Sequence, residues 1–172
     1  FVSDGKTIRG VLRLNNPYNQ HDTPEENMPF MLEAPSLRIE REWNAYTKGA
    51  AVGLTPKPLW RAPDALLCEY LPYKPLQSSP GVSWDILCRA SQALENLHQA
   101  GLTHMDASLA NMLADENLKH ITFIDFEYSP APHIDAPAQR VYDHLRLLES
   151  AWKFIPDPEN WHTWLKIFME AA

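Results

Sequence analysis

The sequence predicts an α+β protein whose strands gather in the first half of the chain, with helices dominating the second half. In the first half, Asp4-Gly5 is a tight-turn pair between two apolar runs, a pattern typical of a β-hairpin. In the second half, apolar residues recur every three or four positions, which is typical of helices that pack on one face. Prolines at 72, 75 and 80 mark a connector between the halves. We therefore expect two small lobes, residues 1–72 and 73–172, that share a cleft.

The first-half elements follow from turn and capping residues. We expect the hairpin over residues 1–14 and a long, Pro-containing loop over residues 15–34. Ser36 is positioned to cap a helix that ends at Gly53. The apolar stripe of this helix consists of Ile39, Trp43, Tyr46 and Ala50.

The next elements alternate between strand and helix patterns. Residues 57–60 and 65–71 have the composition of short strands. Ser83 is positioned to cap a second helix, and Gly101 suits the end of that helix. The core face of this helix consists of Leu87, Ala90, Leu94 and Leu97.

The remainder of the chain is predicted as a hairpin followed by helices. Two short strands are expected over residues 111–114 and 120–125, joined by a turn. Prolines at 130, 132 and 137 predict irregular structure to about residue 137. Residues 138–154 and 161–172 have helical patterns, separated by Pro156 and Pro158.

Composition argues against several classes of partner. The chain has 172 residues and a net charge of −7, with its Lys and Arg residues scattered rather than clustered. This distribution argues against nucleic acid as the main partner and against docking on an anionic membrane surface. No apolar run of about 18 residues is present, so we expect no membrane span. Cys68 and Cys88 form no CxxC motif, which favours buried, inert thiols and a cytoplasmic location.

Three polar residues between positions 104 and 127 give the strongest functional signal. Asp106 is followed five residues later by Asn111, and Asp125 ends an apolar strand. ATP-dependent phosphoryl transfer needs such a set, because one carboxylate orients the attacking hydroxyl while an amide and a second carboxylate hold Mg²⁺ on the phosphates. Asp106 alone would fit a turn aspartate, and Asn111 alone would fit an Asx-turn residue. Their combination favours phosphoryl transfer.

This segment resembles the catalytic loop of atypical protein kinase-like families, in particular the small KEOPS-complex kinases and the bacterial lipopolysaccharide-core (heptose and Kdo) kinases. The resemblance implies a reduced two-lobed kinase-like fold, with a small antiparallel sheet lobe and a helical lobe. It implies that Asp106 is the catalytic aspartate and that Asn111 and Asp125 bind Mg²⁺. It also implies that His104 holds the loop through hydrogen bonds and that Asp143 supports it from below.

In the first half, the resemblance places Arg13 where relatives carry the lysine that contacts the nucleotide phosphates. Glu42 matches the helix glutamate that pairs with this residue. Lys6 is a rival for Arg13, and Glu40 is a rival for Glu42, because helical phase does not separate the two glutamates. The adenine edge would bind the backbone of a hinge, Glu69-Tyr70-Leu71.

The chain also departs from the family pattern. Glu127 stands where many relatives carry glycine, and the stretch between Asp125 and Asp143 is too short for a long peptide-binding segment. The first strand and the Gly-rich phosphate loop are missing and are expected upstream of Phe1. Spacing along the chain suggests no zinc site, so core or surface roles are expected for His98, His104, His120, His133 and His144.

Two functions remain open at this point. One is an ATP- and Mg²⁺-dependent kinase whose acceptor is a hydroxyl group, either of a protein Ser or Thr or of a lipopolysaccharide-core sugar. The alternative is a pseudokinase that acts as a nucleotide-binding or protein-interaction module. Arg13 and the missing phosphate loop support the pseudokinase, whereas three intact catalytic polar residues support the enzyme.

Overall fold

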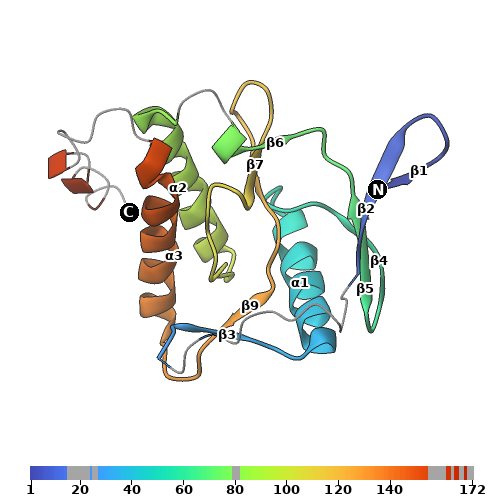
Figure 1. The fold of residues 1–172 in the computed structure, drawn as a ribbon, viewed down its shortest axis with the longest axis horizontal. Coiled ribbons are helices and arrows are strands. Elements are labelled where there is room, and N and C mark those ends of the chain that lie inside the picture. The colour runs from blue at the N-terminus through green and yellow to red at the C-terminus, as the bar shows by residue number, and fades with distance from the viewer. Residues whose placement is uncertain are drawn as a thin grey trace.

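The computed structural model describes residues 1–14, 24, 27–78, 82–154, 162, 163, 165, 166 and 169. It confirms the α+β class, with a four-stranded antiparallel sheet of order β1-β2-β5-β4 at one end of the molecule. Helix α1 lies beside this sheet, and α2 and α3 lie side by side at the other end (Figure 1). The helices are α1 (Pro35–Ala50), α2 (Trp84–Gln99) and α3 (Ala136–Ala151), with short 3₁₀ turns η1 (Leu76–Ser78) and η2 (Trp152–Phe154).

The four-stranded sheet begins with the predicted hairpin. Its strands are β1 (Val2–Ser3), β2 (Ile8–Leu14), β4 (Pro58–Ala62) and β5 (Ala65–Glu69). Asp4 Oδ1 accepts hydrogen bonds from the backbone N–H groups of Lys6 and Thr7, and Gly5 has φ of 90°. Glycine tolerates this left-handed conformation without a steric penalty, so the turn explains the hairpin. Strands β2 and β5 pair antiparallel, with Arg13 opposite Leu66.

Helix α1 begins one residue earlier than predicted and without the predicted cap. Ala34 is the N-cap residue, and no side chain caps the helix, so the capping role expected for Ser36 is wrong. Pro35 in the first turn explains the start instead, because its fixed φ suits a helix and its missing N–H is not needed there. The helix packs on β4 and β5, burying Ile39 and Tyr46.

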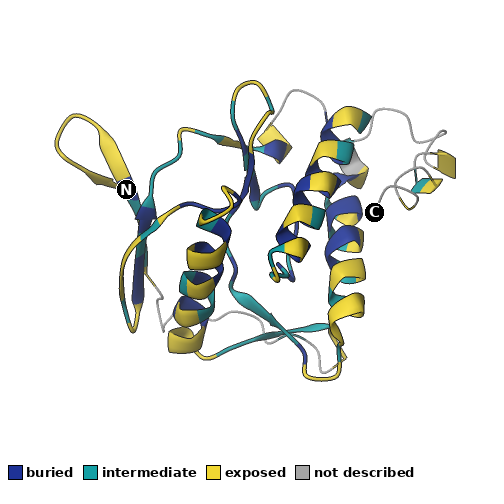
Figure 2. Ribbon diagram, turned by 180° about the vertical axis from the view of Figure 1, so that it is seen from behind, coloured by how far each residue is buried: buried dark blue, intermediate teal, exposed yellow. Residues whose placement is uncertain are grey.

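Helix α2 matches its prediction closely. Ser83 Oγ accepts a hydrogen bond from the backbone N–H of Ile86, which confirms the cap. The four predicted core residues are fully buried. Gly101 follows the helix with φ of 73°, a conformation that explains why glycine ends it. Figure 2 shows the buried stripes of α2 and α3 as dark blue against exposed outer faces.

The segment predicted as irregular between residues 126 and 137 contains regular structure. Strand β9 (Tyr128–Pro130) pairs antiparallel with β3 (Phe30–Leu32), which lies in the stretch predicted as a loop. Helix α3 begins at Ala136, with Asp135 accepting a hydrogen bond from the Ala138 N–H. Pro137 falls in the first helical turn, where proline is tolerated. The prediction was wrong because it treated every proline as a breaker.

A third small sheet has the order β6-β7-β8 and includes the predicted second hairpin. Its strands are β6 (Lys74–Pro75), β7 (Met112–Ala114) and β8 (Ile121–Phe123). Strand β6 lies in the Pro-rich connector, and its pairing with β7 was not predicted. Residues 15–23 and most of the helix predicted over 161–172 lie outside the described residues. Among the described residues, no helix is both long and apolar enough to cross a membrane.

Candidate active site

The predicted catalytic loop lies between α2 and β7 and is fixed from one side by Asp143 of α3. The Asp143 carboxylate is fully buried. It accepts hydrogen bonds from the backbone N–H groups of His104 (2.8 Å) and Met105 (2.7 Å). Its Oδ2 also lies 3.0 Å from Nε2 of His98, a partner that the sequence did not indicate. Asp143 therefore occupies the supporting position that the sequence suggested.

His104 links this loop to the end of β8. Its Nε2 lies 2.9 Å from the Ile124 carbonyl oxygen, and the Asp106 N–H donates to its Nδ1 at 3.3 Å. Since Nδ1 accepts a hydrogen bond, Nε2 carries the proton and donates to Ile124. Burial lowers the pKa of His104, despite the opposing effect of Asp143. These contacts describe a neutral histidine that holds two segments together.

Both oxygens of the Asp106 carboxylate are bound. Asn111 Nδ2 donates to Asp106 Oδ2 at 2.9 Å and to the Asp106 carbonyl oxygen at 3.0 Å. Arg146 Nε donates to Oδ1 at 2.8 Å, and the Asp106 side chain remains 25% exposed. Burial alone would lower the pKa of Arg146, but Asp106 raises it above its ordinary value. The predicted proximity of Asn111 to Asp106 is therefore present in the structure.

Arg146 is the member of this group that sequence reasoning missed. It lies one helical turn after Asp143 on α3, so both side chains approach the catalytic loop from the same helix face. The three-residue spacing between Asp143 and Arg146 was the signal in the sequence that could have revealed Arg146. Using this signal would have required knowing which face of α3 meets the loop, and that depends on tertiary packing.

Asp125 follows β8 in a left-handed conformation, with φ of 70°. Its carboxylate forms an ion pair with Arg13, and its backbone N–H donates to the Tyr46 hydroxyl at 3.3 Å. The preceding residue, Ile124, donates its N–H to the Asn111 carbonyl oxygen at 3.0 Å. Asn111 and Asp125 are therefore brought together by a backbone bond between neighbouring segments.

The ion pair expected between Arg13 of β2 and Glu42 of α1 is present, with 3.1 Å between Nη1 and Oε1. The Glu42 side chain is 2% exposed and also accepts a hydrogen bond from the Tyr46 hydroxyl at 2.7 Å. The two rivals do not occupy this position: Lys6 lies in the β1–β2 turn, and Glu40 is exposed on α1. Burial raises the pKa of Glu42, an effect that Arg13 opposes.

Arg13 contacts two further acids. Its Nη2 lies beside Asp125 and 3.3 Å from Glu127 Oε2, while Arg38 Nη1 lies 3.7 Å from the same Glu127 oxygen. Glu42 and Asp125 raise the pKa of Arg13 above its ordinary value although burial opposes this. Three carboxylates around two guanidinium groups leave a formal charge of −1 at this place.

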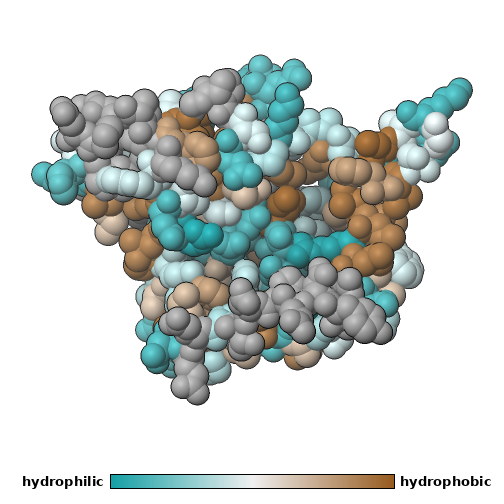
Figure 3. Space-filling view, in the orientation of Figure 1, coloured by the Kyte–Doolittle hydropathy of each residue, from teal (hydrophilic) through white to brown (hydrophobic). Residues whose placement is uncertain are grey.

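A cavity of about 510 Å³ extends from this charged cluster to the predicted hinge. Arg13 and Asp125 line its polar end, and the segment Glu69-Tyr70-Leu71 lines another wall. Cys68, which also lines it, is a free thiol whose pKa burial raises to about 11, whereas Cys88 is only half-buried. Figure 3 shows apolar residues gathered at the end of the molecule that holds the four-stranded sheet, beside a hydrophilic band across the middle of the face.

Neither a protein-family model nor a curated protein matches the chain. Two similar solved structures are crystal structures of the PknI kinase domain of Mycobacterium tuberculosis. One, of a point variant, is 16% identical with a TM-score of 0.46, and the match covers 70% of this chain and 62% of that domain. The other is 13% identical with a TM-score of 0.44, covering 83% of this chain and 85% of that domain.

The chain therefore spans less than two thirds of the first of these two domains. Identities and scores this low assign no activity. The α+β class is established by the strands and helices described above, whereas the likeness to KEOPS-complex and lipopolysaccharide-core kinases stays a prediction.

Proposed function

We propose that this chain is an ATP- and Mg²⁺-dependent phosphotransferase that moves the γ-phosphoryl group of ATP to a hydroxyl acceptor. One observation supports this function above all others. Asp106 and Asn111 are hydrogen-bonded to each other, and the Asn111 carbonyl oxygen accepts the N–H of Ile124, the neighbour of Asp125. Asp125 in turn pairs with Arg13 in the lining of a cavity that the predicted hinge also lines. Adenine would bind along Glu69-Tyr70-Leu71, and the phosphates would extend toward Arg13.

In this proposal, Asp106 aligns the acceptor hydroxyl and accepts its proton. Arg146 and Asn111 hold its two oxygens, which fixes the orientation of the carboxylate. Each carboxylate oxygen can accept more than one hydrogen bond, so a hydroxyl group can still donate to Asp106. Arg146 would act as a positioning residue.

The residues present fit a magnesium ion. Asp125 offers a carboxylate, and Asn111 offers an amide oxygen that points away from the Nδ2 group bound to Asp106. Asp125 Oδ1 is paired with Arg13, and the Asp125 side chain remains 33% exposed, so its carboxylate is still open to a cation. Hard oxygen ligands of this kind suit Mg²⁺, which would neutralise charge on the phosphates.

The charge of the cluster makes a further demand on nucleotide binding. Arg13 already faces three carboxylates, so ATP alone would add negative charge where the formal charge is −1. A divalent cation between Asp125 and the phosphates relieves this repulsion. We therefore expect ATP affinity to depend strongly on Mg²⁺.

Calorimetry with ATP, with and without Mg²⁺, tests the proposal directly. The parent chain should bind ATP in the presence of Mg²⁺, and Asp125→Ala should lose the Mg²⁺-dependent part of the affinity. Asp64→Ala is the matched control, because Asp64 is an exposed aspartate in the turn between β4 and β5. An Asp125→Ala variant with unchanged affinity and metal dependence would refute the metal role.

A second candidate, a pseudokinase, is favoured by one observation: Arg13 replaces the expected lysine and is held by Asp125 and Glu127 as well as Glu42. The two candidates differ in turnover. Radiolabelled ATP and Mg²⁺ are incubated with protein substrates and with lipopolysaccharide-core sugars, and the position of the label is read. Transfer to an acceptor supports the kinase, whereas ATP binding without transfer or hydrolysis supports the pseudokinase.

A further inference from the structure

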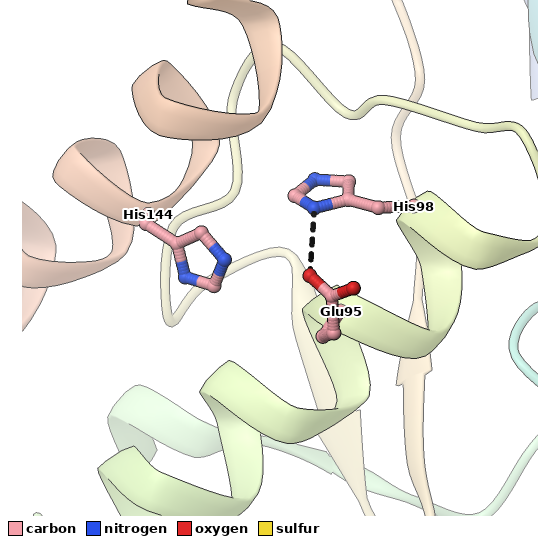
Figure 4. A group of neighbouring side chains, drawn as sticks. All are labelled: Glu95, His98 and His144. Atoms are coloured by element: carbon pink, nitrogen blue, oxygen red, sulfur yellow. Dashed lines mark ion pairs between the residues drawn. The ribbon is translucent and has the colours of Figure 1, made fainter. Parts of the chain in front are cut away.

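A cluster of potential metal ligands lies between α2 and α3, apart from the proposed active site. Glu95 and His98 project from α2 toward His144 of α3 (Figure 4). One ligand atom from each residue lies within 4.8 Å of the other two. The His98 side chain is fully buried, whereas the Glu95 side chain is 31% exposed, so an ion can reach the cluster from solvent.

The two ring nitrogens of His98 have different environments. Its Nε2 lies 3.0 Å from Oδ2 of Asp143. Its Nδ1 is buried, has no hydrogen-bond partner within the described residues, and lies 3.8 Å from Glu95 Oε2. Because the Asp143 carboxylate can only accept, Nε2 of a neutral ring carries the proton and the lone pair of Nδ1 faces Glu95. Metal-binding histidines are commonly held in this way, with a carboxylate behind the ring.

His144 supplies the second imidazole. Its Nδ1 lies 3.4 Å from the Ser91 hydroxyl, and its ring centroid is 5.5 Å from that of His98. The His144 side chain is buried and faces His98 across the contact between α2 and α3. A neutral ring is the form that binds a metal ion.

We propose that Glu95, His98 and His144 bind a divalent transition-metal ion of the zinc class. Two imidazoles and one carboxylate form a common zinc ligand set, with water in the fourth position. Glu95 and His98 are three residues apart, which places them on the same face of α2. His144 is distant in sequence, so the spacing along the chain gave no sign of this site.

Bond lengths of about 2.0–2.2 Å place the ligand atoms of a tetrahedral zinc ion roughly 3.3 Å apart. The 3.8 Å between Glu95 Oε2 and His98 Nδ1 must therefore shorten by a few tenths of an ångström. Rotation of the partly exposed Glu95 side chain can supply this change. The separations that involve His144 reach up to 4.8 Å, so the His144 ring must also move toward the other two ligands for a tetrahedral ion to bind.

Such a site would reach the catalytic loop through Asp143. The carboxylate that holds His98 Nε2 also accepts the N–H groups of His104 and Met105. An ion that fixes His98 therefore also restrains the group on which this loop rests. The ion would join α2 to α3 and stabilise the fold, without contact with the reacting groups.

The alternative occupant of the cluster is a proton. A protonated His98 would bridge the carboxylates of Glu95 and Asp143 as an imidazolium, and zinc would then have no ligand there. The two possibilities differ in their response to added metal. A metal site is stabilised by zinc, whereas the imidazolium bridge is indifferent to it.

The test uses the full chain without a histidine tag, first freed of metal with a chelator. Zinc chloride is titrated by calorimetry, and thermal unfolding is followed with and without zinc. Cobalt(II) then replaces zinc, because its visible absorption reports tetrahedral coordination. The variants are Glu95→Gln and His144→Gln, and the control is His133→Gln, since His133 is exposed and far from the cluster in sequence.

We expect one equivalent of zinc to bind and to raise the midpoint of thermal unfolding of the parent chain. Both ligand variants should bind at least about tenfold more weakly, and the control should match the parent. Glu95 is partly exposed, so Glu95→Gln should remain folded even if His144→Gln does not. The proposal fails if the parent chain shows no zinc response, if Glu95→Gln or a folded His144→Gln retains the response in full, or if His133→Gln loses it equally.

Discussion

At the scale of the residue, the position of Asp106 is set by two different kinds of neighbour. Asn111 belongs to the same loop, whereas Arg146 approaches from α3. Together they hold the carboxylate while leaving a quarter of its side chain exposed. A carboxylate held in this way suits a role in which its orientation toward an acceptor hydroxyl matters as much as its affinity for a proton.

Replacing Asp106 by asparagine tests that role. The amide preserves the shape of the side chain but cannot take a proton, so Asp106→Asn should keep ATP affinity and lose turnover by roughly 10²–10⁴-fold. Calorimetry measures the first quantity, and a phosphoryl-transfer assay measures the second. Asp64→Asn, at an exposed turn, serves as the control. Turnover at the parent rate in Asp106→Asn would show that another group is the catalytic base.

The sequence was most informative where function depends on residues that are close along the chain. Asp106, Asn111 and His104 lie within one short loop, so their spacing alone indicated their proximity. Arg146 and His98 reach the same loop through helix packing, and no local pattern reveals which face of a helix meets a given loop. Their contributions appear only once α2, α3 and the loop are assembled.

At the scale of the element, the Arg13–Glu42 pair joins the sheet to α1. Glu42 is buried, so removal of Arg13 leaves a buried carboxylate that still accepts a hydrogen bond from the Tyr46 hydroxyl. Arg13, in contrast, keeps Asp125 and Glu127 when Glu42 is removed. The two losses are therefore unequal, although both disturb Arg13, the proposed phosphate-binding group.

A double-mutant cycle measures whether the pair acts as a unit in ATP binding. The variants are Arg13→Ala, Glu42→Ala and the double variant. The double variant should bind ATP only slightly more weakly than the single variant that binds it less tightly. This non-additivity corresponds to a coupling free energy of roughly 0.5–3 kcal/mol. The exposed pair Asp85–Arg89 on α2 provides a control cycle, for which we expect additive effects. Additive losses for Arg13 and Glu42 would show that the pair does not grip the phosphates together.

Gly49 allows α1 to approach the segment that follows it. A Cβ atom added there would lie 2.4 Å from Thr55 Cγ2 and 2.8 Å from Thr55 Oγ1. Thr55 is buried and donates its hydroxyl to the Tyr46 carbonyl oxygen, so it cannot move freely. Glycine normally weakens a helix by about 1 kcal/mol relative to alanine, but here overpacking outweighs that gain.

Gly49→Ala should therefore destabilise the fold by about 1–3 kcal/mol, measured by urea unfolding. The double variant Gly49→Ala with Thr55→Ala removes the two atoms nearest to the new methyl group and should recover part of the loss relative to Thr55→Ala alone. A single Gly49→Ala variant more stable than the parent would show that α1 can shift away from Thr55.

Elements were predictable where turn or capping chemistry is local. Asp4-Gly5 and Ser83 identified the first hairpin and the start of α2 because their hydrogen bonds span only a few residues. Strands β3 and β9 escaped notice because each is completed by a partner in a distant part of the chain. Pro130 adds to this difficulty, since a proline is accommodated in a strand only when its missing N–H faces away from the partner.

At the scale of the whole molecule, buried histidines make stability depend on pH. Burial lowers the pKa values of His104 and His144 below their ordinary value of 6.5. Below that pH the unfolded chain binds more protons at these positions than the folded chain does. Their contribution to the free energy of unfolding is therefore complete above about pH 6.5 and decreases as the pH falls toward the lower folded-state pKa values. Glu42 works in the opposite direction, because burial raises its pKa above 4.5.

The difference between variants isolates the histidine contribution from that of Glu42. We expect the free energy of unfolding of the parent chain to decrease between about pH 7.5 and about pH 5.5 more steeply than that of His144→Gln, which has no group to protonate at this position. His133→Gln should follow the parent, since His133 is exposed. Urea unfolding in the presence of a chelator measures these slopes, because zinc bound to neutral histidines would itself make stability depend on pH. A His144→Gln variant with the slope of the parent would mean that His144 takes up its proton equally well in the folded chain.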